Sequence, residues 1–204
     1  MSQPKPKKEP LALAVDISNW SGTISPDAVA AWQAQGIEKV VVGTQNIHIA
    51  RQQMKVVKDA GLELEAYVYL YGHLGASAQI HDAMDTIAGF SVDRLWLDVE
   101  DEKSGKTPEQ WIEFLGLAIA ISTVAFEYGL GVYTRAAYWR QHLGNTTLFR
   151  HLPLWNAWYM GKPNLDDFTP YGGWSREEMR QYTNTQTLAG VQVCRDVYRT
   201  KEAA

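Results

Sequence analysis

The stretch RLWLDVEDEKSG, residues 94–105, joins a strand pattern to an acidic turn. Apolar and polar residues alternate from Arg94 to Glu100, a pattern typical of a β-strand. Alternation places Asp98 and Glu100 on one face, about 6.6 Å apart along the strand. The two carboxyl groups can therefore flank a single bond of a substrate. Four acidic residues fall within five positions here: Asp98, Glu100, Asp101 and Glu102.

Patterns typical of strands and helices alternate around this stretch. A helix is expected after the first strand, with Ser25 as its N-cap and Pro26 at its first helical position. Gly36 lies just beyond its last turn. A long helix is expected to begin at Thr107 and Pro108, to run to about residue 128 and to stop at Gly129. Strands are expected at 11–17, 38–44, 62–71, 94–100 and 130–134, each followed by a helix.

The alternation stops after residue 143. Three further strands are expected at 152–159, 179–183 and 191–198, joined by loops. The predicted fold class is therefore α/β, an irregular TIM-like barrel of five βα units followed by three strands. An open doubly wound sheet is the alternative, but SNWSG follows the first strand where that fold would carry GxGxxG. We expect residues 1–10 to form a disordered lead-in and residues 11–204 a single domain.

Composition narrows the classes of function. Hydrophobic residues make up 46% of the 204, enough for a substantial core. The net charge of −4 argues against nucleic acid or an anionic membrane as a partner. The single cysteine, Cys194, allows no internal disulfide, and the five histidines show no zinc spacing. We expect a monomer without a metal or cofactor, and see no signal peptide or membrane span in the sequence.

Three interpretations of the acidic stretch are open at this point. The carboxylates can simply cap a solvated turn. They can hold a divalent cation, although alternation should point Asp101 away from Asp98 and Glu100. They can also catalyse glycoside hydrolysis, which needs one protonated carboxyl group and one ionised carboxylate. Mutual repulsion and partial burial would separate the two pKa values and so assign the roles.

Six segments, in this order and spacing, together carry a resemblance to a known family: VDISNW (15–20), AYVYL (66–70), WLDVED (96–101), GVYTRAAYW (131–139), PLWNAWY (153–159) and RQYT (180–183). With them the chain resembles glycoside hydrolase family 25 from about residue 12 to residue 198. The resemblance implies a barrel of five βα units and three more strands. Enzymes of that family are lysozymes that cut the bond between N-acetylmuramic acid and N-acetylglucosamine in peptidoglycan.

The resemblance implies roles for individual residues. Glu100 corresponds to the general acid, and Asp98 to a residue that orients the acetamido group or stabilises the oxocarbenium-like transition state. Asp16 would line the same pocket, and Tyr67 matches the tyrosine of the family's AYHF segment. Plausible pocket walls, each with ordinary barrel packing as the alternative, are Trp20, Tyr133, Trp158 and Tyr159.

The chain also departs from the family pattern. The last strand of the family carries V-D-x-N, whereas VCRD here places Cys194 at the Asp position and Asp196 at the Asn position. Val68 stands where the family has histidine, and VVVGTQN replaces a segment that commonly contains arginine. A glycosidase acting on another amino-sugar polymer and a glycan-binding barrel without hydrolysis are therefore the alternatives. A phage-type lysin and a processed secreted enzyme both remain open as biological settings.

Overall fold

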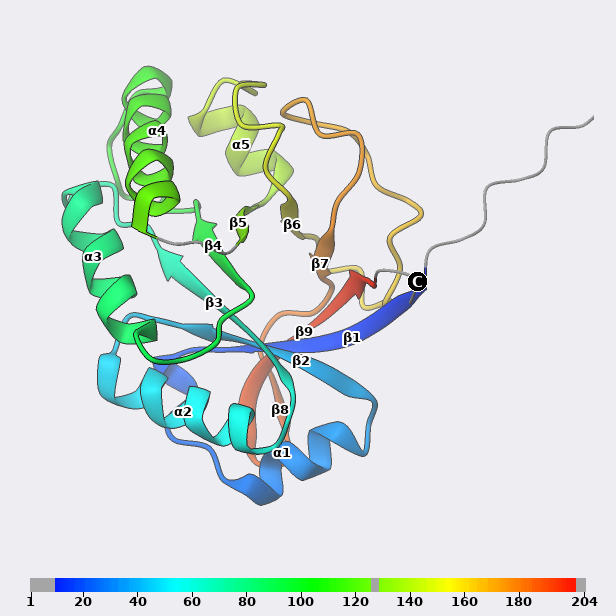
Figure 1. Cartoon of the computed structure of the whole chain (residues 1–204). Helices are drawn as coiled ribbons and strands as arrows, with labels where there is room; N and C mark the ends of the chain where they lie inside the picture. Colours follow the sequence, from blue (N-terminus) through cyan, green and yellow to red (C-terminus); the bar gives the residue numbers. More distant parts are fainter. Residues whose placement is uncertain (1–9, 126–128, 201–204) are drawn as a thin grey trace, which may run out of the picture.

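The computed structural model describes residues 10–125 and 129–200. Within these ranges the strands form one mixed sheet that curls into a barrel (Figure 1). The predicted lead-in, apart from Pro10, and residues 201–204 of the predicted domain lie outside the described residues. The strands are β1 (Leu11–Ile17), β2 (Ile37–Gly43), β3 (Glu63–Tyr69), β4 (Arg94–Asp98), β5 (Gly129–Thr134), β6 (Leu154–Ala157), β7 (Met179–Gln181), β8 (Gln186–Leu188) and β9 (Val191–Arg199).

The barrel is closed by its last strand. Strands β1 to β7 lie side by side in chain order and are parallel, whereas β9 is antiparallel to both β7 and β1. The pairing of β9 with β1 runs from Leu11 opposite Arg199 to Asp16 opposite Cys194. Eight strands, β1 to β7 and β9, thus form a closed barrel. The predicted fold class, an irregular α/β barrel of five βα units and three further strands, is confirmed.

Strand β8 was absent from the sequence-based prediction. Among the described residues it pairs with β9 alone, as an antiparallel hairpin outside the closed barrel. Ala189 and Gly190 both have positive φ, 51° and 81°, as a two-residue hairpin turn requires. The strand is three residues long and largely exposed, so it carries no apolar alternation from which it could be predicted.

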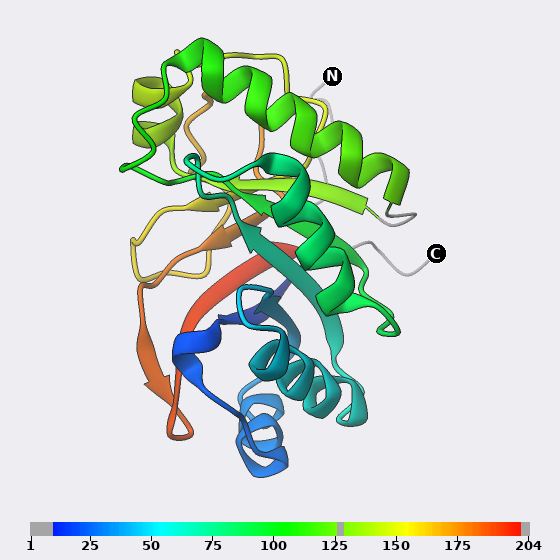
Figure 2. The same cartoon turned by 90° about the vertical axis from the view of Figure 1, so that its left-hand side faces the viewer.

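The helices lie outside the barrel (Figures 1 and 2). Ser25 Oγ accepts from Ala28 N at 3.2 Å and Pro26 opens the first α-helix, as predicted. The predicted end of the long helix near residue 128 lies outside the described residues, and Gly129 already belongs to β5. None of the described helices is both long and apolar enough to cross a membrane. The helices are α1 (Pro26–Gln33), α2 (Ile47–Asp59), α3 (Ala76–Ile87), α4 (Pro108–Ala125) and α5 (Ala136–His142), with a short 3₁₀ turn at Asn19–Ser21.

Five predicted strands, β2, β3, β4, β6 and β7, end one to two residues earlier than expected, and the changes at β4 and β6 affect the site. β4 ends at Asp98 rather than Glu100, because its neighbour β3 has already ended at Tyr69. β6 covers residues 154–157 rather than 152–159. Glu100, Trp158 and Tyr159 therefore lie on the segments that follow the strands, at the rim of the barrel.

The barrel interior is filled largely by aromatic side chains. Trp96 and Trp155 are almost fully buried there, with ring centroids 5.6 Å apart in an edge-on arrangement. Trp96 Nε1 donates to Glu65 Oε2 at 2.6 Å, and Glu65 also pairs with the buried Lys39 at 2.7 Å. These contacts lie towards the end of the barrel at which the parallel strands begin, where Lys39, Glu65 and Trp96 also line a cavity of about 530 Å³. Active groups of such barrels gather at the opposite end, where the parallel strands finish.

Gly131 on β5 provides the space for Trp96, so we predict that Gly131→Ala destabilises the fold. A Cβ at this position would overlap the Trp96 ring, which its hydrogen bond to Glu65 holds in place. The expected loss is about 1–3 kcal/mol in urea unfolding. Gly116→Ala on α4 is the matched control, because a Cβ there meets nothing within 4 Å. An unchanged unfolding free energy for Gly131→Ala would contradict this account of the interior.

Candidate functional site

A cavity of about 410 Å³ opens at the end of the barrel where β1, β3, β4 and β5 finish. It brings together residues that are far apart in the sequence, because parallel strands all finish at the same end of a barrel. Most of the residues predicted for the site line this cavity: Asp16, Trp20, Tyr67, Asp98, Glu100, Tyr133, Tyr159 and Cys194. Two predicted residues, Trp158 and Asp196, do not line it.

Asp98 and Glu100 reach the cavity from different backbone environments. Asp98 is the last residue of β4, paired with Tyr69 of β3 and Tyr133 of β5. Val99 follows the strand but remains bound to β5: its N–H donates to Tyr133 O at 2.9 Å, and its carbonyl accepts from Thr134 Oγ1 at 2.8 Å. This anchored residue carries Glu100 to the rim of the cavity although Glu100 lies outside the strand.

Asp98 is buried without a hydrogen-bond donor for one of its oxygens. The residue is 5% exposed, and Oδ1 has no partner among the described residues. Burial raises the pKa of Asp98 well above its usual range, and the nearby charges of Glu100 and Asp16 raise it further. Asp98 lines the open cavity, and a carboxyl group in its protonated form can both donate a hydrogen bond and accept one.

Glu100 is only partly buried, and its acidity is set by opposing effects. Burial raises its pKa to about 7, and Asp16 and Glu102 add to the rise, whereas the Arg135 guanidinium lowers it. Arg135 itself forms an ion pair with Glu102 across the rim. Glu100 thus holds its proton up to neutral pH, as a general acid must.

Asp16 is the carboxyl group of this cluster with a defined donor. Gln181 Nε2 donates to Asp16 Oδ2 at 2.7 Å, and Tyr133 Oη donates to Gln181 Oε1 at 2.9 Å, which fixes the orientation of the amide. Burial raises the pKa of Asp16 to about 6, while the bond from Gln181 favours the ionised form and limits the rise. At pH 7 Asp16 is therefore mostly ionised.

Asp196 lies deeper in the barrel than the cavity. β9 runs antiparallel to β1, so moving from Cys194 to Asp196 moves from the level of Asp16 to that of Ala14. Asp196 is fully buried, and its Oδ1 accepts from Trp155 Nε1 at 2.8 Å. Burial and the charge of Asp16 raise the pKa of Asp196 well above its usual range. Asp196 therefore lies beneath Asp16 in the barrel interior and does not line the cavity.

Cys194 lines the cavity beside Asp16, its direct partner across the β1–β9 pairing. Burial raises the pKa of the thiol, and the charges of Asp16 and Asp196 raise it further. The side chain is therefore a neutral thiol at the place where the family pattern has a carboxylate.

The other two acidic residues of the opening stretch have separate partners. Asp101 Oδ2 accepts from Gly72 N at 2.9 Å and Oδ1 from Lys103 N at 3.1 Å, so Asp101 stabilises the turn. Glu102 pairs with Arg135. In the part of the chain that the structure describes, no three His, Cys, Asp or Glu side chains are placed to share a metal ion.

Aromatic residues form the walls of the cavity. Trp20 follows β1 on the 3₁₀ turn and is 83% exposed, and Tyr159 follows β6 and is 52% exposed. Exposed rings at a cavity rim provide flat apolar faces of the kind that sugars stack against. Trp158, in contrast, stacks on the Arg180 guanidinium, 4.5 Å from its ring centroid, and faces a neighbouring cavity.

Two residues that influence the acidity of the site, Gln181 and Arg135, were not predicted from the sequence. Gln181 belongs to the RQYT segment, and its position at the end of β7 was a usable signal. Arg135 directly follows the β5 strand pattern, but its influence on Glu100 depends on the folding of the 100–105 turn. Neither the spacing nor the composition of the sequence indicates that contact.

The raised pKa of Glu100 predicts a pH-dependent cost in stability. Its pKa is about 4.3 in an unfolded chain and about 7 when folded, so the folded state binds the proton more tightly. Stability is therefore lost as the pH rises from about 4 through 7. We expect Glu100→Gln to raise the unfolding free energy at pH 8 relative to wild type by roughly 1–3 kcal/mol more than at pH 4.

Chemical denaturation of both proteins at the two pH values measures this difference. Glu113→Gln, at an exposed position on α4, is the matched control and should show no such dependence. An equal effect of Glu100→Gln at both pH values would contradict the raised pKa.

The sequence of this chain is similar to the sequences of known proteins. Residues 8–182 match the family described as Lysozyme-like protein 1. The "Probable GH family 25 lysozyme 2" of Dictyostelium discoideum is 30% identical over 138 residues, 66% of this chain and 65% of that protein. The "Probable GH family 25 lysozyme 3" of the same organism is 28% identical over 88% of this chain but only 39% of its own length.

The fold is also found among solved structures. A family GH25 lysozyme from Aspergillus fumigatus superposes with a TM-score of 0.78 at 19% sequence identity, over 95% of this chain and 96% of that one. This structural similarity shows the fold alone. The family match, which covers residues 8–182, shows to which family the chain belongs. The chain belongs to the lysozyme-like proteins of glycoside hydrolase family 25.

Proposed function

We propose that this protein hydrolyses the glycosidic bond between N-acetylmuramic acid and N-acetylglucosamine in peptidoglycan. The observation that carries the proposal is the meeting of three carboxyl groups, Asp16, Asp98 and Glu100, in one open cavity, where burial raises the pKa of each. Glycoside hydrolysis needs such a group, in which one carboxyl group is protonated and another is ionised. The names of the Dictyostelium relatives support the same class of activity.

In this proposal Glu100 is the general acid. It is protonated up to about pH 7, and it lies after β4 at the rim of the cavity, where it can approach a glycosidic oxygen. Proton donation to that oxygen lets the leaving sugar depart as an alcohol while the remaining sugar ring gains positive charge. A water molecule then adds to this ring and gives a proton back to the Glu100 carboxylate, which restores the acid.

Asp16 and Asp98 have complementary roles in the same scheme. Asp16 has a pKa of about 6 and a hydrogen-bond donor in Gln181, so it supplies the negative charge that stabilises the oxocarbenium-like transition state. Asp98 lines the same cavity and its Oδ1 has no hydrogen-bond partner among the described residues, so in this scheme it orients an acetamido group of the substrate. Trp20 and Tyr159 provide the stacking faces for the sugar rings.

Glu100→Gln should abolish hydrolysis while the protein stays folded. General acid catalysis contributes about 10²- to 10⁴-fold, so we expect a loss of at least about 100-fold. Clearing of cell-wall suspensions and release of new reducing ends from purified peptidoglycan measure the rate. Glu113→Gln is again the control and should retain wild-type activity. A Glu100→Gln protein that keeps more than about a third of the wild-type rate would disprove the assignment of Glu100.

The neutral thiol at position 194 generates a separate prediction. Cys194→Asp places a carboxylate beside Asp16 and in the same cavity as Glu100. Added negative charge raises the pKa of Glu100, so the acid stays protonated to higher pH. We expect the alkaline limb of the pH–rate profile to move upwards by about 0.5–1 pH unit, with a higher rate.

Cys194→Ser separates the charge from the loss of the thiol, since serine adds no charge, and should leave the alkaline limb in place. If Cys194→Asp lowers the rate while the protein remains folded, the thiol belongs to a site for another amino-sugar polymer. If wild type binds glycan but releases no reducing ends, the chain is a glycan-binding barrel without hydrolysis.

A further inference from the structure

A second cavity adjoins the one that holds the carboxylates. Its volume is about 460 Å³, and it lies between α5 and the segment that follows β6. Tyr159 lines both cavities, so a ligand seated over Asp98 and Glu100 can extend a substituent past this ring into the second cavity. Arg135, at the rim of the second cavity, is only two residues beyond Tyr133 of the first.

The two cavities differ in charge. The first contains Asp16, Asp98 and Glu100, whereas the second is lined by Arg135 and Arg140 and by no acidic residue. This contrast is pronounced in a chain whose net charge is −4. An anionic substituent would be repelled by the first cavity and attracted to the second.

Arg140 is the cation best placed to bind an anion. It is exposed on α5, and among the described residues it forms no ion pair; its guanidinium lies 5.9 Å from the Tyr171 ring centroid. Arg135 donates to Glu102 through Nη2, and the guanidinium has further N–H groups for a second acceptor. Guanidinium groups bind carboxylates in a planar, bidentate geometry.

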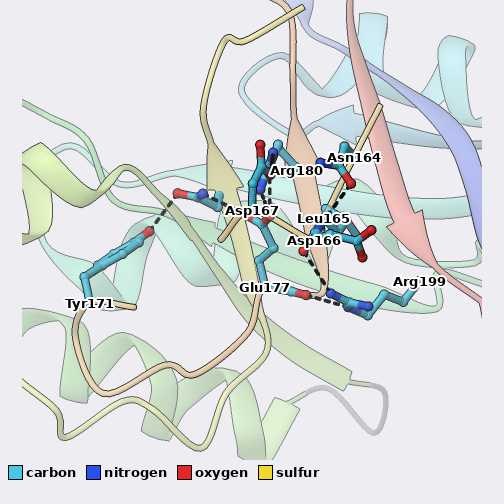
Figure 3. Close-up of polar contacts among 9 residues, drawn as sticks. Asn164, Leu165, Asp166, Asp167, Tyr171, Glu177, Arg180 and Arg199 are labelled. Carbon is cyan, nitrogen blue, oxygen red and sulfur yellow. Dashed lines mark hydrogen bonds and ion pairs between the residues drawn. The ribbon is translucent and has the colours of Figure 1, made fainter. Parts of the chain in front are cut away.

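The floor of this cavity is held by a buried polar network (Figure 3). Tyr171 Oη donates to Asn156 Oδ1 at 3.0 Å, and Asn156 Nδ2 donates to Glu177 Oε2 at 2.7 Å. Arg180 then pairs with both Glu177 and Asp167 and supports the Trp158 ring. Because two carboxylates compensate the charge of Arg180, it fixes the floor and adds no free positive charge to the cavity.

We propose that this second cavity binds the acidic peptide that muramic acid carries on its lactyl group, with Arg140 and Arg135 as the groups that recognise its carboxylates. The aromatic floor accommodates the apolar parts of that peptide. Uncharged chitin-type glycans have no substituent that uses the two arginines. The proposal rests on the proposed function, since it specifies which amino-sugar glycan the site prefers.

The test compares one muramyl-peptide disaccharide with the same compound after amidation of its peptide carboxylates. Calorimetric titration into the Glu100→Gln protein measures affinity without turnover. The acidic compound should bind roughly three- to tenfold more tightly than the amidated one. Arg140→Gln should reduce this ratio to below about twofold, and Arg140→Glu should bring it to one or reverse it.

Arg150→Gln is the matched control, since Arg150 is exposed and lies at a different cavity near the start of β6; it should keep the unmodified ratio. Equal affinity for the two compounds, no binding of either at millimolar concentration, or a ratio unaffected by both Arg140 variants would overturn the proposal. Turnover of peptidoglycan by wild type is measured separately. Turnover without charge preference refutes the second cavity alone, and charge preference without turnover refutes the hydrolytic function alone.

Discussion

The antiparallel pairing of β9 with β1 is the constraint on which the rest of the structure depends. It joins the two ends of the chain and turns a curled sheet into a closed barrel. Its register also sets the site, since it places Cys194 opposite Asp16 and Asp196 opposite Ala14. A slip by one residue would exchange the inner and outer faces of β9 and remove Asp196 from the barrel interior. Closure and chemistry are therefore specified by the same set of backbone hydrogen bonds.

The interior of the barrel explains why the acidic cluster is unusual. Trp96 and Trp155 fill the space beneath the cavity, so the carboxyl groups above them lie on an apolar floor rather than on a solvated one. Burial is the first cause of the raised pKa of Asp16, Asp98 and Glu100. This arrangement destabilises the ionised carboxylates and so lowers the stability of the folded protein at the pH values at which they ionise. A loss of stability of this kind is typical of catalytic sites.

Charged residues at the rim of the barrel also influence the acidity of Glu100. Arg135 lies between Glu100, whose acidity it increases, and the second cavity, which it lines. Glu102 binds Arg135 from the other side and shares its charge. The segments after β4, β5 and β6 thus connect the acidity of the proposed catalytic acid with the proposed recognition of an anionic substituent. In barrels of this type, loops at this end carry function while the strands hold them in place.

The sequence by itself determined the order of the strands and helices, the barrel and most of the acidic site. Alternation in RLWLDVE and the Ser25–Pro26 helix start are local signals, and local signals are what a sequence carries directly. The depth of Asp196, the outward placement of Trp158 and the contact of Arg135 with the acidic turn were decided only by the tertiary structure. Each depends on strand register or on where a neighbouring strand ends. Those features arise from pairing between distant segments, and no pattern within a single segment encodes them.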